Sequence, residues 1–283
     1  MKIKNLFIAG GTSGMGKAIA MHYLRRGSTV TVVGSTDSKG KRLLEEAAQF
    51  GVAEHLNYIQ ANLMSVAENR RVIEIVKARH ESLDAVILTA MMPFPKRIET
   101  EDGFEGTFSL YYVSRFVLSY GLTDLLERSE NPLILSLGGT GMTQGKIHWD
   151  DLALNSRYNL FTAMLQGGRA NDLLGVAYAE NHKNGKTRFI LDHPGYTNSG
   201  LGHVKQPMRT LMRIMAILFA QPVEKSIQLI IQLLDNPPQQ PLIAWDRTHA
   251  VDLSLTSLDP ANAQRLYETT KHLVADFVAD PIK

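Results

Sequence analysis

Short apolar runs recur along the chain and alternate with segments of helical spacing. The apolar runs predict strands at residues 4–9, 29–33, 56–60, 85–89, 133–137 and 187–191, and a last short strand at 242–245. Apolar residues three and four positions apart predict helices at 42–50, 67–80, 103–129, 160–180 and 223–234. Continuous apolar strands separated by helices are typical of a parallel sheet covered on both faces. The pattern therefore predicts an α/β fold with a doubly wound parallel sheet in three layers.

The same pattern shows no repeat, low-complexity segment or linker that would divide the chain. We therefore expect a single domain over residues 1–283. Residues 207–220 are rich in methionine and leucine and contain two arginines. We expect a helix at about 207–220 that packs over the carboxyl edge of the sheet, with a substrate lid as the alternative.

Composition narrows the function classes. A net charge of +2 gives no electrostatic case for nucleic acid as a partner. The absence of cysteine excludes disulfides, thiolate metal sites and cysteine nucleophiles. The nine histidines show no metal-ligand spacing with acids, so we expect no metal. No apolar run has the length of a signal peptide core or a transmembrane segment, which predicts a cytoplasmic protein and leaves a homo-oligomer open.

The first apolar run ends in a glycine-rich turn that opens into helical spacing. Glycines let the backbone approach a phosphate, and the free N–H groups of a helix N-terminus favour negative charge. Residues 11–17 read G-x-x-x-x-G-K, but Ala18 stands where a P-loop needs Ser or Thr. The other interpretation is a dinucleotide loop, and a tight turn that binds nothing is the third. The residues expected to bind a dinucleotide here are Gly10, Thr12, Ser13, Gly14, Met15 and Gly16.

The end of the second predicted strand favours a 2′-phosphate. An NAD site uses an acid at this point to hold the ribose 2′-hydroxyl. This chain has Ser35 and Thr36 instead, followed by the basic Lys39, Lys41 and Arg42. Two hydroxyls and nearby cations suit a phosphate, so we expect NADP(H) rather than NAD(H).

Two further strand ends fit the other parts of a dinucleotide. The third strand is followed by Asn62 and Leu63, which place a polar side chain at an adenine edge. The sixth strand leads into a Pro-Gly turn, from which Pro194, Gly195 and Thr197 would lie near a nicotinamide carboxamide. These residues join the glycine turn in the predicted cofactor site.

At this point the motifs resemble the short-chain dehydrogenase/reductase family over nearly the whole chain. Residues 9–16, AGGTSGMG, resemble the family's T-G-x-x-x-G-[IM]-G. Residues 100–108 resemble T-x-D-G-x-E-x-x-F, residues 145–152 resemble G-x-I-x-x-D-D-L, and residues 193–195 match H-P-G. These spellings are similar to the branch that holds retinol dehydrogenases, protochlorophyllide reductases and WW-domain oxidoreductases. The resemblance implies a Rossmann fold, and it adds Ala90 to the cofactor site, the one residue kept from the family's N-N-A-G.

The same resemblance implies a catalytic Asn, Ser, Tyr and Lys, and this chain has none of them in place. The family exchanges the substrate proton through the Tyr phenol, which the Lys makes more acidic. Around the branch's A-Y-x-Q-S-K-x-A-N, residues 163–171 read AMLQGGRAN, so Met164 replaces Tyr and Gly168 replaces Lys. Gly139 stands at the Ser position and Tyr111 at the Asn position. Methionine and glycine side chains carry no exchangeable proton, so we assign no catalytic residue.

We therefore expect an NADP(H)-binding protein of oxidoreductase descent that is atypical or redox-inactive. Its expected substrate pocket, lined by Tyr111, Gly139, Met164, Gly168 and Tyr196, would take a bulky apolar small molecule. One alternative is a divergent NADPH-dependent reductase of a carbonyl or alkene, with Tyr111 as the substitute proton donor. The other is a non-redox dehydratase, isomerase or cyclase that uses the old pocket.

Overall fold

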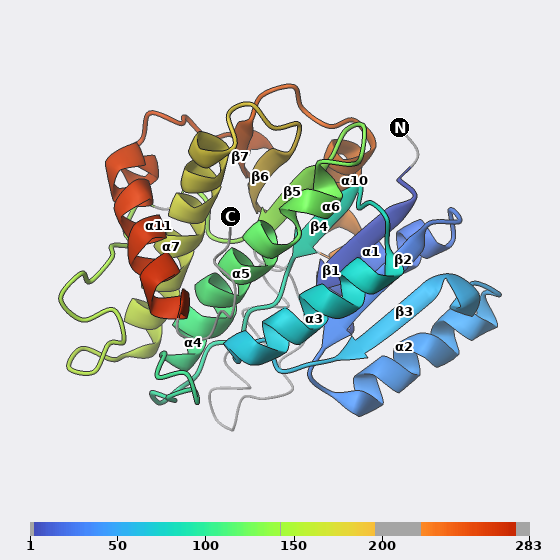
Figure 1. Ribbon diagram of the computed structural model, residues 1–283, viewed down its shortest axis with the longest axis horizontal. Helices are drawn as coiled ribbons and strands as arrows, with labels where there is room; N and C mark the ends of the chain where they lie inside the picture. Colours follow the sequence, from blue (N-terminus) through green and yellow to red (C-terminus); the bar gives the residue numbers. More distant parts are fainter. Residues whose placement is uncertain (1–2, 142, 196–221, 276–283) are drawn as a thin grey trace.

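The computed structural model describes residues 3–141, 143–195 and 222–275, in which eight strands form one sheet (Figure 1). The order is β3-β2-β1-β4-β5-β6-β7-β8; neighbours from β3 to β7 pair in parallel, and β8 is antiparallel to β7. The strands are β1 (Asn5–Ala9), β2 (Thr29–Gly34), β3 (Leu56–Gln60), β4 (Ala85–Leu88), β5 (Leu133–Leu137), β6 (Arg188–His193), β7 (Leu242–Asp246) and β8 (His249–Ala250). The strand order reverses between β1 and β4, and ligands of such sheets bind at the carboxyl ends beside this reversal.

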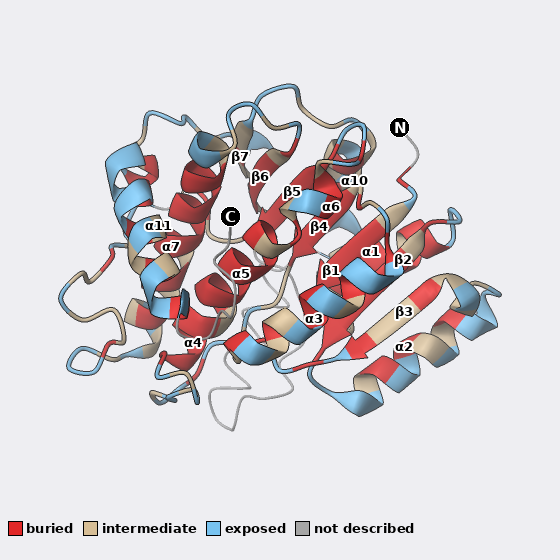
Figure 2. Ribbon diagram, viewed as in Figure 1, coloured by how far each residue is buried: buried red, intermediate tan, exposed pale blue. Residues whose placement is uncertain are grey.

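Helices cover both faces of the sheet and bury two separate apolar cores (Figure 2). One face carries α1 (Gly14–Leu24), α2 (Asp37–Gln49) and α10 (Gln228–Asp235). The other carries α3 (Val66–Arg79), α5 (Ser114–Gly121) and α7 (Leu160–Asn181), against which α11 (Pro260–Ala275) packs. The short elements are η1 (Ala53–His55), α4 (Gly106–Phe108), η2 (Ser109–Val113), α6 (Thr123–Leu126), α9 (Val223–Ser226) and η3 (Thr256–Leu258). This three-layer arrangement confirms the predicted fold class.

The predicted helix over 103–129 is wrong in its bounds. Gly103 has a φ of +79° and lies in a turn, and the helix begins only at Gly106. Its first part is α4, its second is the π-helical turn η2, and its third is α5, which ends at Gly121. A π-helical turn is wider than an α-helical one and is frequent at functional sites. The apolar runs also do not predict β8 or α11.

Two carboxylates of the T-x-D-G-x-E motif hold helix starts in place. Asp102 accepts a hydrogen bond of 2.8 Å from the Val66 N–H at the start of α3. Glu105 is fully buried and accepts from the Thr107 and Phe108 N–H groups, both at 2.8 Å. The motif is therefore structural here: it caps α3 and the α4–α5 helix, which carries Tyr111.

Substitution Glu105→Ala is expected to lower the free energy of unfolding by about 2 kcal/mol, because two charge-assisted cap bonds are lost in a buried position. Urea denaturation followed by circular dichroism measures the change. Glu105→Gln, which keeps an acceptor for one N–H group, should lose less. Equal stability of Glu105→Ala and the unchanged protein would contradict the capping role.

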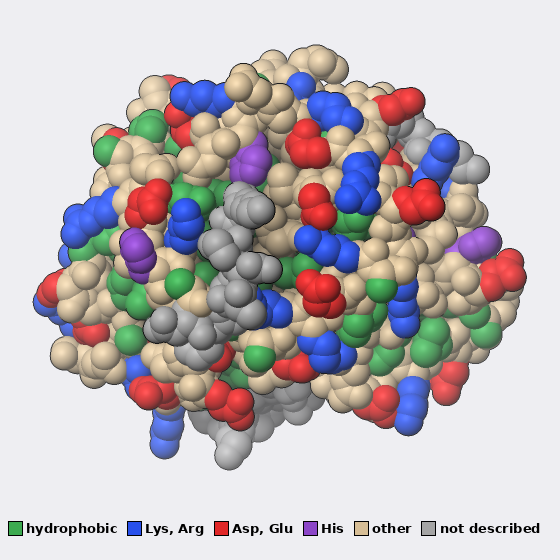
Figure 3. Space-filling view, in the orientation of Figure 1, with side chains coloured by type: hydrophobic (Ala, Val, Ile, Leu, Met, Phe, Trp, Pro, Cys, Tyr) green, Lys and Arg blue, Asp and Glu red, His purple; other side chains and the backbone are tan. Residues whose placement is uncertain are grey.

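Two further expectations concern a lid near the carboxyl edge of the sheet and the absence of a membrane-spanning segment. The helix or lid expected at about 207–220 lies outside the described residues. Among the helices of the described part, none is long and apolar enough to cross a bilayer. Figure 3 shows basic and acidic side chains interspersed over the face seen in Figure 1.

Candidate functional site

The glycine turn joins the ends of β1, β2 and β4. The N–H groups of Gly10 and Gly11 donate to the Val33 carbonyl at 2.9 and 3.2 Å. Gly10 has a φ of +88°, and a Cβ there would lie 2.7 Å from the Ala90 nitrogen. A Cβ on Gly16 would lie 2.6 Å from the Gly10 carbonyl oxygen. These positions admit only glycine, because any side chain would fill the cradle that the backbone forms.

Helix α1 begins directly after this cradle, at Gly14. Ser13 precedes it in extended conformation and makes no side-chain hydrogen bond to the first helical N–H groups. Those N–H groups and the helix dipole therefore face the turn without a capping carboxylate. Thr12 packs against Gly34, where a Cβ would lie 2.6 Å from the Thr12 side chain. The expected residues of 10–16 thus come together in a form that fits a diphosphate.

The loop after β2 presents the residues expected to meet a 2′-phosphate. Ser35 and Thr36 are exposed. Lys41 is paired with Asp37, Nζ to Oδ2 at 2.8 Å, so its charge is already compensated. Within the described residues, Lys39 and Arg42 form no ion pair. Two hydroxyls and two uncompensated cations remain for an anion at this loop.

The remaining cofactor residues follow the ends of β3, β4 and β6. Asn62 is exposed and its Oδ1 accepts from the Met64 N–H at 3.2 Å, while Leu63 is buried below it. Ala90 donates its N–H to the Ala9 carbonyl at 3.0 Å. Gly195, in the turn with Pro194, has a φ of +81°, which favours glycine. Tyr196 and Thr197 lie outside the described residues.

Tyr111 fills a corner lined by glycines. A Cβ built on Gly138 would lie 3.1 Å from the phenol oxygen, and one on Gly168 would lie 3.9 Å from it. A Cβ on Gly167 would lie 2.8 Å from Tyr111 Cδ1, closer than side chains approach. The phenol oxygen also takes a backbone hydrogen bond from Gly139. The structure therefore brings Tyr111, Gly139 and Gly168 of the expected pocket together.

Met164 is partly buried on α7 and precedes Gly168 by four residues, so both lie on the same helix face. Helix-interior glycines cost about 1 kcal/mol each relative to alanine. On α7 the absence of a side chain at Gly167 gives the Tyr111 ring its place. The Tyr111 ring therefore occupies space beside the positions of the replaced catalytic residues.

Arg115 is a buried cation next to this corner. It is 1% exposed, and its guanidinium lies 4.6 Å from the centroid of the Tyr111 ring. Nη1 donates to Ser136 Oγ at 2.8 Å, the Leu137 carbonyl at 2.6 Å and Asn171 Oδ1 at 3.0 Å. Nη2 donates to the Ala90 carbonyl at 3.1 Å. All four acceptors are uncharged, so no carboxylate of the described part of the chain is in hydrogen-bond contact with this positive charge.

Burial sets the protonation states in this cluster. It lowers the pKa of Arg115 to about 10, which still leaves the guanidinium charged at neutral pH. It raises the pKa of Tyr111, while the Arg115 charge and the Gly139 hydrogen bond act in the opposite direction. Tyr111 is therefore a neutral phenol at physiological pH, held beside a fixed positive charge.

Two acids are buried near the carboxyl edge. Asp172 on α7 accepts from Thr140 Oγ1 at 3.2 Å, and burial raises its pKa to about 7. Asp192 on β6 is 1% exposed, and neither of its carboxyl oxygens has a hydrogen-bond partner among the described residues. Burial and the charge of Asp246 raise the pKa of Asp192 to about 7.

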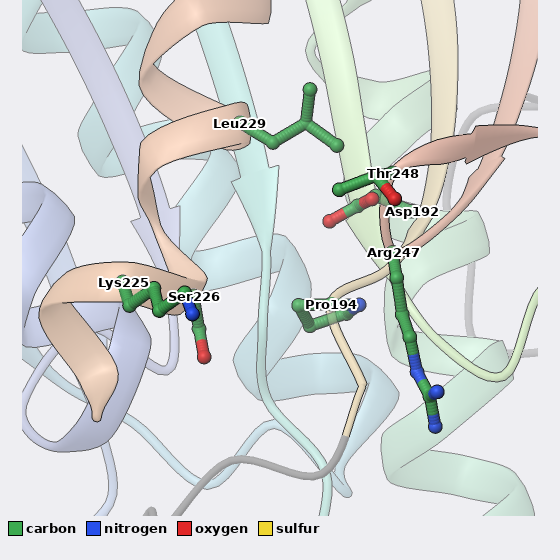
Figure 4. A pocket seen from close by; sticks show the side chains of 7 residues that line it. All are labelled: Asp192, Pro194, Lys225, Ser226, Leu229, Arg247 and Thr248. Carbon is green, nitrogen blue, oxygen red and sulfur yellow. The ribbon is translucent and has the colours of Figure 1, made fainter. Parts of the chain in front are cut away.

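Asp192 points into a small cavity of about 70 Å³ between β6, α9, α10 and the turn after β7 (Figure 4). The other lining residues are Pro194, Lys225, Ser226, Leu229, Arg247 and Thr248. The cavity is large enough for a few water molecules. It adjoins the Pro-Gly turn of the predicted cofactor site.

Three charged residues in or near the site were not predicted from the sequence: Arg115, Asp172 and Asp192. Arg115 is a lone charged residue among apolar neighbours, and that contrast is the signal that could have found it. Asp172 follows Arg169 and Asn171, and Asp192 ends its apolar run, so neither stands out from its neighbours. Arg169, which follows the lost Lys position, instead holds the loop before α7, donating to the carbonyls of Gly145 and Thr143 at 2.9 and 3.2 Å. No group of three or more potential metal ligands occurs within the described residues.

Comparison with known proteins decides the family. A model of the short chain dehydrogenase family matches residues 4–149, more than half of the chain. The chain belongs to the short-chain dehydrogenase family. Human retinol dehydrogenase 14 is 23% identical over 290 residues, covering 96% of this chain and 86% of that protein. This relative agrees with the branch that the motifs indicate.

Other similar proteins cover less of their own length or share only the fold. Human polyprenol dehydrogenase is 28% identical over 164 residues, which is 56% of this chain and 49% of that protein. The chain thus spans about half the length of this curated relative. The NADPH-bound carbonyl reductase from chicken fatty liver superposes with a TM-score of 0.66 at 14% identity, covering 89% of this chain and 99% of that one. This short-chain dehydrogenase therefore has the fold of proteins that bind NADPH.

Proposed function

We propose that this short-chain dehydrogenase is an atypical NADP(H)-dependent reductase of a bulky apolar carbonyl or alkene. The observation that carries the proposal is the Tyr111 phenol, which lies against Gly138, Gly139 and Gly168 beside the lost catalytic positions. A proton source is thus present in the corner where the family's own residues are absent. When bound, NADPH supplies a hydride, and the chain must supply the proton.

The cradle at Gly10 and Gly16 and the uncapped start of α1 support binding of the cofactor diphosphate. The Pro194–Gly195 turn supports placement of the nicotinamide end near β6. Two relatives support the substrate class, because their names, retinol dehydrogenase and polyprenol dehydrogenase, refer to long apolar alcohols. Met164 in place of a tyrosine makes the wall of the pocket more apolar.

NADPH is expected to bind at least 10-fold more tightly than NADH, a difference of about 1.4 kcal/mol. The reason is the pair of exposed hydroxyls at Ser35 and Thr36 with the uncompensated Lys39 and Arg42. Cofactor fluorescence titration measures both affinities. A double variant, Lys39→Ala with Arg42→Ala, should lose the preference. Lys41→Ala is the matched control, because Asp37 already compensates that charge; equal affinity for the two cofactors would contradict the choice of NADP(H).

Hydride transfer is tested with all-trans-retinal as the acceptor. We expect loss of NADPH absorbance at 340 nm together with formation of retinol, identified by chromatography. A protein that binds NADPH tightly but reduces neither retinal nor the α,β-unsaturated ketone of a second apolar acceptor, β-ionone, would be a redox-inactive binder. That result would overturn the reductase while leaving the cofactor site intact.

A further inference from the structure

The arrangement of Tyr111 and Arg115 has a chemical consequence beyond packing. The two residues are four positions apart on the helix that runs from Gly106 to Gly121, and the guanidinium lies 4.6 Å from the ring centroid. Residues four apart lie on the same face of a regular helix, and the π-helical turn η2 widens the segment that contains Tyr111. The pair is therefore built into one continuous element.

Burying a guanidinium without an anion is costly, because the charge leaves water and gains only neutral hydrogen bonds. Within the described residues, Arg115 contacts no carboxylate, and its Nε has no hydrogen-bond partner. The group next to it that can become an anion is the Tyr111 phenol. A phenolate at Tyr111 would face a fixed cation and the Gly139 N–H, and both of these stabilise the phenolate against the burial that raises the phenol's pKa.

We propose that Tyr111 and Arg115 form a relocated proton-donating pair, in which Tyr111 gives its proton to the substrate and Arg115 positions the phenol and stabilises the phenolate left behind. The inference rests on the proposed reductase function. Its residues lie on α4–α5 rather than on α7, where the family carries its phenol and amine. Nothing in the pair occupies a position of the family's Tyr or Lys.

Reduction of a carbonyl substrate to an alcohol requires one hydride and one proton. The carbonyl carbon receives a hydride, with its two electrons, from the cofactor, and the C=O π bond becomes a lone pair on oxygen. The O–H bond of Tyr111 breaks as that oxygen takes the proton, and the product is the alcohol. The phenolate then recovers a proton from water. A neutral phenol is the form that the proton transfer needs, and burial keeps Tyr111 in that form at neutral pH by raising its pKa.

The first test removes the hydroxyl group, and with it the exchangeable proton, from each of two neighbouring tyrosines in turn. Tyr111→Phe is expected to lower the rate of retinal reduction by NADPH by about 10²- to 10⁴-fold, while NADPH affinity stays within about twofold. Tyr112→Phe is the matched control, because Tyr112 is also buried on η2 but its hydroxyl forms a hydrogen bond with Thr270 of α11, at 2.8 Å. Equal rates in Tyr111→Phe and the unchanged protein would overturn the role of Tyr111.

The second test measures what Arg115 does to Tyr111 without any substrate. Carbon-13 labelling at tyrosine Cζ reports the pKa of Tyr111 by NMR, assigned by the signal that Tyr111→Phe removes. The charged groups that act on this phenol are Arg115 on α5 and Asp172 on α7. Arg115→Met is expected to raise the pKa of Tyr111, and Arg115→Lys to restore most of the difference. An unchanged pKa in folded Arg115→Met would show that Arg115 only packs.

Failure of the proposed reductase function and failure of the Tyr111–Arg115 pair give different experimental results. If NADPH binds but no acceptor is reduced by the unchanged protein, the proposed function fails, and the proton-donating role of Tyr111 fails with it. If retinal is reduced and Tyr111→Phe is as active as Tyr112→Phe, the reductase stands and the relocated pair is wrong. Where Arg115→Met does not fold, Arg115→Lys carries the test: a high-pH limb of the rate profile that moves together with the Tyr111 pKa supports the pair, and an unmoved limb overturns it.

Discussion

Replacement of Asp192 by asparagine is expected to stabilise the protein by an amount that grows with pH. The carboxyl is buried and has no hydrogen-bond partner in the part of the chain that the structure describes, so its ionisation inside the fold is unfavourable. Its pKa is raised from 3.8 to about 7 in the folded protein. The folded state therefore binds more protons than the unfolded chain above pH 4, and the carboxyl destabilises the fold progressively as pH rises towards 7.

The expected gain for Asp192→Asn grows from about 0.5 kcal/mol at pH 4 to an upper limit of about 4 kcal/mol at pH 8. Chemical denaturation at several pH values measures it, and data taken well below pH 3.8 serve as the internal control, because there the acid is neutral in both states. Asp150→Asn controls for a change of charge alone, since Asp150 is exposed and paired with Arg157 at 2.8 Å. A gain that does not depend on pH would contradict the linkage.

Restoring the family's catalytic residues is expected to restore its ordinary chemistry. The variant combines Gly139→Ser, Met164→Tyr and Gly168→Lys with Tyr111→Asn. The last change is needed because the Tyr111 phenol lies where new side chains must go, 3.9 Å from a Cβ on Gly168. We expect retinal reduction at least about 10²-fold faster than in Tyr111→Asn alone, the size of effect that a positioned acid contributes.

The single variant Tyr111→Asn is the reference, because it lacks both the present phenol and the restored one. NADPH affinity, measured in parallel, separates catalysis from cofactor binding. A fourfold variant that binds NADPH but stays as slow as Tyr111→Asn would show that the pocket around α7 no longer accepts the family's geometry. Gly138 is left unchanged because a Cβ there would lie 2.7 Å from Asn171 Nδ2.

Local sequence predicts the sheet well, because its five central strands, β1, β2, β4, β5 and β6, are buried on both faces and therefore read as continuous apolar runs. The strands at 56–60 and 133–137 agree to the residue with β3 and β5. Helix α11 was not predicted because its composition is polar on average, although Ala263, Leu266 and Val274 form a buried stripe along it. The π-helical turn η2 escaped because no local signal distinguishes it from an α-helix; its shape depends on what Tyr111 packs against.

The candidate site also contains a part that the sequence predicts and a part that it does not. The cofactor loop was predictable because the close backbone contacts of Gly10 and Gly16 require glycine at those two positions, so the constraint is visible in the residue type itself. Arg115 was not, because its partners Ser136, Asn171 and Ala90 come from three other elements and meet it only in the folded chain. A pairing that arises from tertiary structure has no fixed spacing in sequence.

Ala90 connects the two halves of the site through its backbone. Its N–H is held by the end of β1, next to the cradle for the cofactor, and its carbonyl is held by the Arg115 guanidinium. These two groups belong to the two peptide planes that meet at the Ala90 Cα, so a change in φ or ψ of Ala90 turns one plane against the other. Loading of the nucleotide loop and alignment of the phenol are therefore linked through the backbone of a single residue. The nitrogen-15 and carbonyl carbon-13 shifts of residues 89–91 would report both events in one spectrum.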